Sequence, residues 1–162
     1  MKYILIIILM GCCTYIGYGF SKYYTNRKVF FNDLVLLMDK LKLDINFSKD
    51  KVGDIVKDYV CFSSHFEKLK NNFLTILQSN QFEDGKLFDG INILKQEEIN
   101  SLKAFFKSLG RFDVENQTKQ IISFKEEFKK YENESNLKKQ KYGSLFIKLG
   151  FIVGVLISLL II

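Results

Sequence analysis

Apolar residues fill both ends of this 162-residue chain, and the charged residues lie between them. Residues 3–20 and 149–162 carry no charge. A helix of about 20 apolar residues crosses a bilayer core about 30 Å thick. The second apolar pattern extends back to Tyr142 and includes Lys148, whose ammonium group can reach the lipid headgroups. The pattern therefore predicts two transmembrane helices, over residues 3–20 and 142–162.

Residues 22–141 have the alternation of apolar and polar positions that is typical of amphipathic helices. After the first span, apolar residues recur at helical spacing from Phe30 to Ile45. The polar residues between them are expected on a solvated face: Asn32, Asp33, Asp39 and Lys42. This segment is predicted to be one amphipathic helix.

Two more helices are expected in the first half of this region. Ser48 can be the N-cap of a helix whose apolar side runs from Val52 to Val60. A third helix extends from Phe66 to Leu77. Asp84-Gly85 and Asp89-Gly90 then predict turns in the loop that follows.

The fourth helix is expected to begin near Gln96, because acidic residues in its first turn suit the positive end of the helix dipole. Gly110 is the predicted C-terminal cap of this helix, and Asp113 is the predicted N-cap of the fifth. No glycine or proline occurs between Asp113 and Tyr142. The fifth helix is therefore expected to continue without a break into the second span.

The chain contains no proline, which permits long helices and argues against a β-sandwich or barrel with proline-rich turns. About 120 residues remain outside the two spans, enough for one small domain. We expect an all-α protein, with a helical bundle domain over residues 22–141 between an N-terminal and a C-terminal transmembrane helix.

The net charge of +6 comes from basic residues that flank the predicted spans. All lysines and arginines except Lys2 lie between the two uncharged segments. Basic residues next to a span favour the cytoplasmic side, which places the domain in the cytoplasm and disfavours a nucleic-acid partner. The flanking residues are Lys22, Arg27 and Lys28 after the first span, and Lys138, Lys139 and Lys141 before the second.

Two of the three cysteines, Cys12 and Cys13, lie in the first predicted span, and Cys61 is alone in the domain. No disulfide within the domain is possible, which agrees with a reducing compartment. Cleavage at Cys12, as in a bacterial lipoprotein, is an alternative. The apolar pattern continues to Phe20, which favours an uncleaved span.

The sequence offers little chemistry for catalysis. His65 is the single histidine, so a site with several histidine ligands is excluded. The adjacent pairs Glu97-Glu98 and Glu126-Glu127 are typical of a solvated helix face. Most of the sixteen phenylalanines occur at core spacing, which indicates packing instead of an aromatic binding groove. We predict no catalytic residue, no metal site and no cofactor.

Three glycines in or near the second span are candidates for close helix packing. Gly143, Gly150 and Gly154 would let a neighbouring helix backbone approach in lipid, and the last two form a GxxxG pattern.

The segment Leu-Gly-Arg-Phe-Asp-Val-Glu-Asn-Gln, from Leu109 to Gln117, resembles the signature Leu-Gly-x-x-Asp-x-x-x-Gln of the stage III sporulation protein AB family. The order of spans and helices is also similar to that family along nearly the whole chain. Two positions differ from the family pattern. Residues 47–51 lack the usual proline-containing turn, and Phe112 stands where a small polar residue is common.

The resemblance implies a non-enzymatic membrane component of the complex that links mother cell and forespore in endospore-forming bacteria. Family members are similar to the helical cytoplasmic platform domains of type II secretion and type IV pilus systems. The implied partners are a cytoplasmic secretion-type ATPase, other stage III sporulation membrane proteins and membrane lipid. The soluble domain would lie in the mother cell cytoplasm.

Leu109, Gly110, Asp113 and Gln117 are the candidate interaction motif. Their alternative role is a folding motif that caps two helices. Two other functions stay open: a platform-like component of another secretion or pilus system, and a membrane-anchored extracytoplasmic binding protein.

Overall fold

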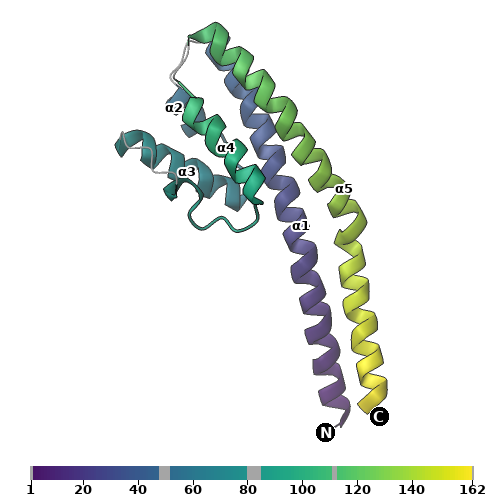
Figure 1. Ribbon diagram of the computed structural model, residues 1–162. Helices are drawn as coiled ribbons and strands as arrows, with labels where there is room; N and C mark the ends of the chain where they lie inside the picture. The colour runs from purple at the N-terminus through teal and green to yellow at the C-terminus, as the bar shows by residue number, and fades with distance from the viewer. Residues whose placement is uncertain (1, 48–51, 80–84, 111–112, 162) are drawn as a thin grey trace. The chain divides into compact units, whose positions relative to one another are not determined.

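The computed structural model describes residues 2–47, 52–79, 85–110 and 113–161. These residues form helices and contain no strand, which confirms the predicted all-α class. The elements are α1 (Lys2–Phe47), α2 (Val52–Lys57), α3 (Ser64–Ser79), the short 3-10 helix η1 (Lys86–Phe88), α4 (Gln96–Ser108) and α5 (Val114–Ile161) (Figure 1).

Helix α1 is one unbroken helix of 46 residues. The predicted amphipathic helix is part of this longer helix, which also includes residues 3–20. Residues 23–29 contain no glycine or proline, so each backbone N–H can continue the helical hydrogen bonding. The predicted continuity of the fifth helix is confirmed, because α5 runs for 48 residues from Val114 to Ile161.

The chain divides into two compact units. Unit 1 consists of Met1–Lys28 and Glu134–Ile162, and unit 2 is Val29–Asn133. Unit 2 is shorter at both ends than the predicted domain, residues 22–141, because the flanking residues pack within unit 1. The predicted limits refer to the membrane surface, which helix packing does not test, so they stay predictions.

Aromatic side chains connect the helices of unit 2. Phe30 of α1 contacts Phe66 of α3, and their ring centroids lie 5.4 Å apart. Phe105 of α4 contacts Phe128 of α5 at 5.7 Å. Burial of each such ring contributes about 1.5–3 kcal/mol. Among the residues that the structure describes, seven phenylalanines are buried, which confirms for them the predicted core role: Phe30, Phe31, Phe66, Phe73, Phe105, Phe106 and Phe128.

Val60 and Leu77, which were expected on apolar helix faces, are exposed instead. Helix α2 ends at Lys57, so Val60 lies beyond it in the connection to α3, where 75% of its surface is exposed. Leu77, near the end of α3, is 44% exposed. The proposed cap Ser48 lies outside the described residues, as does Asp84 of the first predicted turn. The turn at Asp89-Gly90 is confirmed by the positive φ of +70° at Gly90.

Asp33 is fully buried, although its position in the pattern predicted a solvated face. Its Oδ2 accepts hydrogen bonds from the backbone N–H groups of Phe62 and Ser63, at 2.9 and 2.7 Å. The Ser63 hydroxyl oxygen in turn accepts the N–H of Phe66 at 3.3 Å, as an N-cap of α3. A side chain of α1 therefore holds the chain where it enters α3.

Burial raises the pKa of the Asp33 carboxyl, and the N–H groups of Ser63 and Phe62 oppose this shift. The same connection is held by Lys70, whose Nζ donates to the Tyr59 carbonyl oxygen at 2.8 Å. These bonds fix the geometry of residues 58–63, a segment without regular helix.

We expect Asp33→Ala to lower the free energy of unfolding by about 2–4 kcal/mol, because two buried N–H groups lose their acceptor. The measurement is thermal unfolding of the full chain in detergent, followed by circular dichroism, together with amide hydrogen exchange. The amides of Phe62 and Ser63 should lose protection. Asp58→Ala, an exposed change in the same connection, is the control. Unchanged protection of both amides in Asp33→Ala would contradict this role.

Candidate functional site

Gly110 lies in the turn between α4 and α5, directly after the C-cap residue Leu109. Its φ of +76° is in the left-handed region, which glycine adopts without the steric cost of a Cβ. The Gly110 N–H donates to Oε1 of Gln117 at 2.9 Å. Gln117 is 2% exposed and lies one turn inside α5, so its side chain reaches back to the end of α4. The preceding residue, Leu109, belongs to the core of unit 2.

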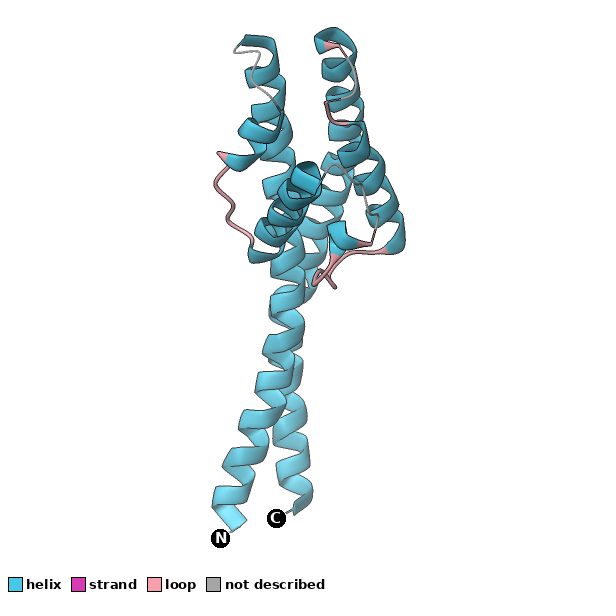
Figure 2. Ribbon diagram, turned by 90° about the vertical axis from the view of Figure 1, so that its left-hand side faces the viewer, coloured by secondary structure: helices cyan, strands magenta, loops and turns pink. Residues whose placement is uncertain are grey.

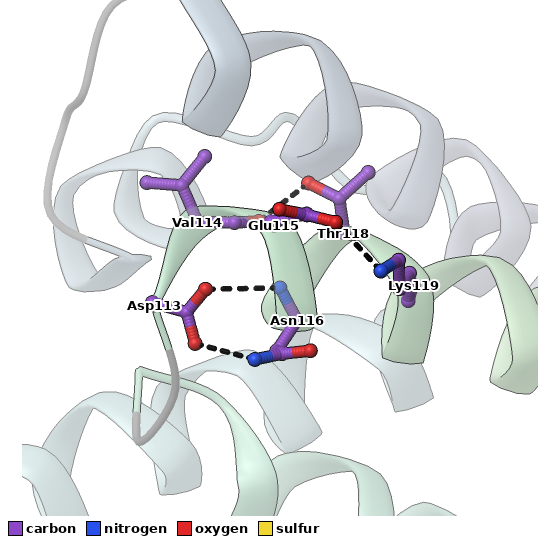
Figure 3. Close-up of polar contacts among 6 residues, drawn as sticks. All are labelled: Asp113, Val114, Glu115, Asn116, Thr118 and Lys119. Carbon is purple, nitrogen blue, oxygen red and sulfur yellow. Dashed lines mark hydrogen bonds and ion pairs between the residues drawn. The ribbon is translucent and has the colours of Figure 1, made fainter.

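Asp113 caps the first turn of α5 (Figure 3). Its Oδ1 accepts from the side-chain amide of Asn116 at 2.7 Å, and its Oδ2 accepts from the Asn116 backbone N–H at 3.4 Å. These bonds from Asn116 lower the pKa of the exposed Asp113 carboxyl. The predicted N-cap is therefore present in the structure.

The signature residues Leu109, Gly110, Asp113 and Gln117 thus form a helix connection. We call this group the α4–α5 turn. Local hydrogen bonds and core packing within this turn explain why the signature residues occur at this spacing. Exposed side chains surround the turn at Asp113, Val114 and Glu115, with Val114 45% exposed. Binding of a partner at this surface stays a prediction.

In unit 1, segments of α1 and α5 lie side by side and antiparallel (Figures 1 and 2). They approach each other closely at glycines. A Cβ placed on Gly17 would lie 2.4 Å from the Phe146 carbonyl oxygen, and one on Gly150 would lie 2.6 Å from the Cys13 carbonyl oxygen. A Cβ on Gly154 would lie 3.2 Å from the Met10 Cα. Backbone meets backbone at these points, so we call the three glycines the glycine seam.

Two of the three predicted packing glycines, Gly150 and Gly154, are in the seam, whereas Gly143 is not. A Cβ on Gly143 would meet its nearest atoms at the ordinary distances of 3.8 and 3.9 Å. Gly17 was missed as a packing residue. Cys13, Gly17 and Ser21 repeat every four residues on α1, and this spacing of small residues could have identified it.

Hydroxyl groups along the seam are satisfied within their own helices. The Ser158 hydroxyl donates to the Gly154 carbonyl oxygen at 2.7 Å, and Thr14 donates to the Met10 carbonyl oxygen at 2.9 Å. Such internal bonds are what an apolar surrounding requires, because lipid offers polar groups no partner.

An aromatic cluster lies beside the seam, close to basic residues. The Phe146 ring stacks with Phe20 at 5.4 Å and with Tyr24 at 5.9 Å. Lys141 Nζ lies 5.3 Å from the ring centroid of Tyr142, which also contacts Tyr24. Tyrosines and lysines together are typical of the headgroup region of a membrane.

Glu98 and Glu127 accept hydrogen bonds within the fold, and His65 is half-buried. Glu98 is buried, contrary to the expected solvated face, and its Oε2 accepts the Lys95 N–H at the start of α4 at 2.7 Å. Glu127 Oε1 accepts from the hydroxyls of Ser101 and Tyr131 at 2.6 and 3.0 Å. Partial burial, together with the charge of Lys68, lowers the pKa of His65. The predicted absence of catalysis stays a prediction.

Among the described helices, α5 is long and apolar enough to cross a membrane, by the length and composition of Val114–Leu159. This agrees with membrane association. The first predicted span, over residues 3–20, is not confirmed by this criterion and stays a prediction.

These features define an all-helical protein with an apolar helix of membrane-spanning length. The family model described as stage III sporulation protein AB matches residues 2–162. The chain therefore belongs to the stage III sporulation protein AB family, as the Leu109–Gln117 segment indicated. Comparisons with curated proteins and with solved structures found no match.

Gly110→Ala should lower the free energy of unfolding by about 1–2 kcal/mol, because alanine is strained at a φ of +76°. Thermal unfolding in detergent measures the change. Gly85→Ala is the matched control, since Gly85 has a φ of −73° and open space around it. Equal effects of the two substitutions would argue against strain at Gly110.

Gly17→Ala should disrupt the glycine seam, because the new Cβ meets a backbone oxygen that cannot rotate away. Overpacking of this kind costs about 1–3 kcal/mol. Gly11→Ala, on the same helix with no atom within 4 Å of the added Cβ, should be neutral. The readout is the thermal midpoint of the detergent-solubilised protein, and an unchanged midpoint for Gly17→Ala would refute the close approach.

Proposed function

We propose that this protein is a non-enzymatic, two-span component of the stage III sporulation membrane complex that links mother cell and forespore. In this complex it acts as a platform for a cytoplasmic secretion-type ATPase. Family membership over residues 2–162 supports the sporulation role. The observation that carries the platform proposal is the continuity of α5, which belongs to both compact units without a break.

The basic residues support a cytoplasmic position for unit 2. Unit 1 carries exposed lysines beside the apolar segments, at Lys22 on α1 and at Lys141 on α5. Lysine and arginine beside a span are retained on the cytoplasmic side. With both flanks basic, the two spans would form a hairpin with unit 2 in the mother cell cytoplasm.

The proposed mechanism uses α5 as a mechanical connection. The ATPase would contact the surface around the α4–α5 turn, where Asp113, Val114 and Glu115 are exposed at the start of α5. A displacement there would pass along the hydrogen-bonded backbone to the apolar part of the same helix. Other stage III membrane proteins would contact the spans and complete the assembly.

The test is deletion of the gene in its sporulating host, with heat-resistant spores and the stage of arrest as readouts. Arrest after engulfment, reversed by the wild-type gene, is expected. Wild-type spore yield in the deletion strain would overturn the sporulation role.

Complementation with Leu137→Pro tests the mechanical connection in the same strain. Proline at this position would break α5 at a cost of about 3 kcal/mol. Because Leu137 is 65% exposed, the substitution would remove little packing. We expect Leu137→Pro to fail and Leu137→Ala to restore spores, with both proteins at wild-type level by immunoblot. Normal spores from Leu137→Pro at that level would reject transmission through α5.

A further inference from the structure

An open groove of about 530 Å³ lies on α1 within unit 1. Gly19 makes room for it, because no atom lies within 4 Å of the place a Cβ would occupy. The groove is lined by Ile16, Gly19, Phe20, Tyr23 and Tyr24.

The side chains that line the groove are mainly apolar and exposed on the outside of the helix. Ile16 is 61% exposed and Phe20 is 55% exposed. Both lie in the predicted span, and the tyrosines follow where the span ends. In a bilayer, such a groove is surrounded by lipid hydrocarbon, so a lipid acyl chain is its natural occupant.

Positive charge next to the groove favours an anionic headgroup. Residues 1–28 contain four basic residues and no acidic residue. Lys22 is exposed and follows Gly19 by three positions, so it borders the same helix face. Arg27 lies beyond Tyr23, with its guanidinium carbon 6.0 Å from the Tyr23 ring centroid. Arg27 is buried, so the exposed Lys22 is the residue that offers positive charge to a phosphate, and residues 1–28 present no carboxylate to a choline or ethanolamine ammonium group.

We propose that this groove is a binding site for an anionic phospholipid. The acyl chain lies over Gly19 against Ile16 and Phe20, and the negative headgroup is bound at Lys22. The site rests on the membrane insertion that is part of the proposed function. Each basic residue near an anionic membrane surface strengthens binding on the order of fivefold, so Lys22 should account for a preference of that size.

The experiment uses the full chain in nanodiscs that contain equal amounts of phosphatidylglycerol and phosphatidylcholine. Lipids that stay bound after release into mild detergent are identified and counted by native mass spectrometry. The wild type should retain phosphatidylglycerol about fivefold over phosphatidylcholine. Gly19→Leu, which fills the groove, and Lys22→Gln, which removes the charge, should each bring the ratio near one.

Two matched variants control for general effects. Gly11→Leu is the same change on the same helix. No atom lies within 4 Å of a Cβ added at Gly11, which lines another groove with Met10, Tyr15 and Tyr18. Lys148→Gln removes another exposed lysine of unit 1. Both should keep the wild-type preference, and all four variants should keep the helix content measured by circular dichroism.

Equal retention of the two lipids by the wild type would overturn the inference, as would an unchanged preference in Gly19→Leu. A wild-type dimer that retains no lipid and dissociates in Gly19→Leu would also overturn it, because a second copy would then occupy the groove. The proposed function fails by other results, namely a chain that does not insert into nanodiscs or a deletion strain with normal spores.

Discussion

The two long helices depend on backbone hydrogen bonding that continues without interruption over 46 residues in α1 and 48 in α5. A helix satisfies its own N–H and C=O groups, which is the condition for entering lipid. Proline would remove one donor and break this series of bonds, and the chain contains none. The phenylalanine core, the glycine seam and the α4–α5 turn each include residues of these two helices.

The two compact units are stabilised in different ways. Unit 2 buries large rings such as Phe66 and Phe105, and removal of apolar surface from water is the main favourable term in folding. Unit 1 brings backbones together at Gly17 and Gly150, where no side chain intervenes. Close backbone contact of this kind stabilises helix pairs in lipid, where apolar burial gives no advantage. The contrast agrees with the membrane position proposed for unit 1.

The family signature has a structural explanation in this chain. Gly110 permits the left-handed end of α4, Gln117 accepts its N–H, and Asp113 caps α5. These contacts require no partner, so the signature alone does not identify a binding surface. The proposed ATPase contact therefore rests on the exposed side chains around the turn and on the continuity of α5.

The sequence by itself determined the features that depend on near neighbours. Helical periodicity indicated the α-class, and acidic residues in the first turn indicated the start of α4 near Gln96. The α4–α5 turn followed from bonds over three to seven residues. Tertiary structure decided the rest. Asp33 is buried because its partners Phe62 and Ser63 lie 29 and 30 residues away. Gly17 matters because Phe146, on another helix, approaches it. Periodicity describes one helix at a time, whereas burial and close approach depend on which distant segment packs against it.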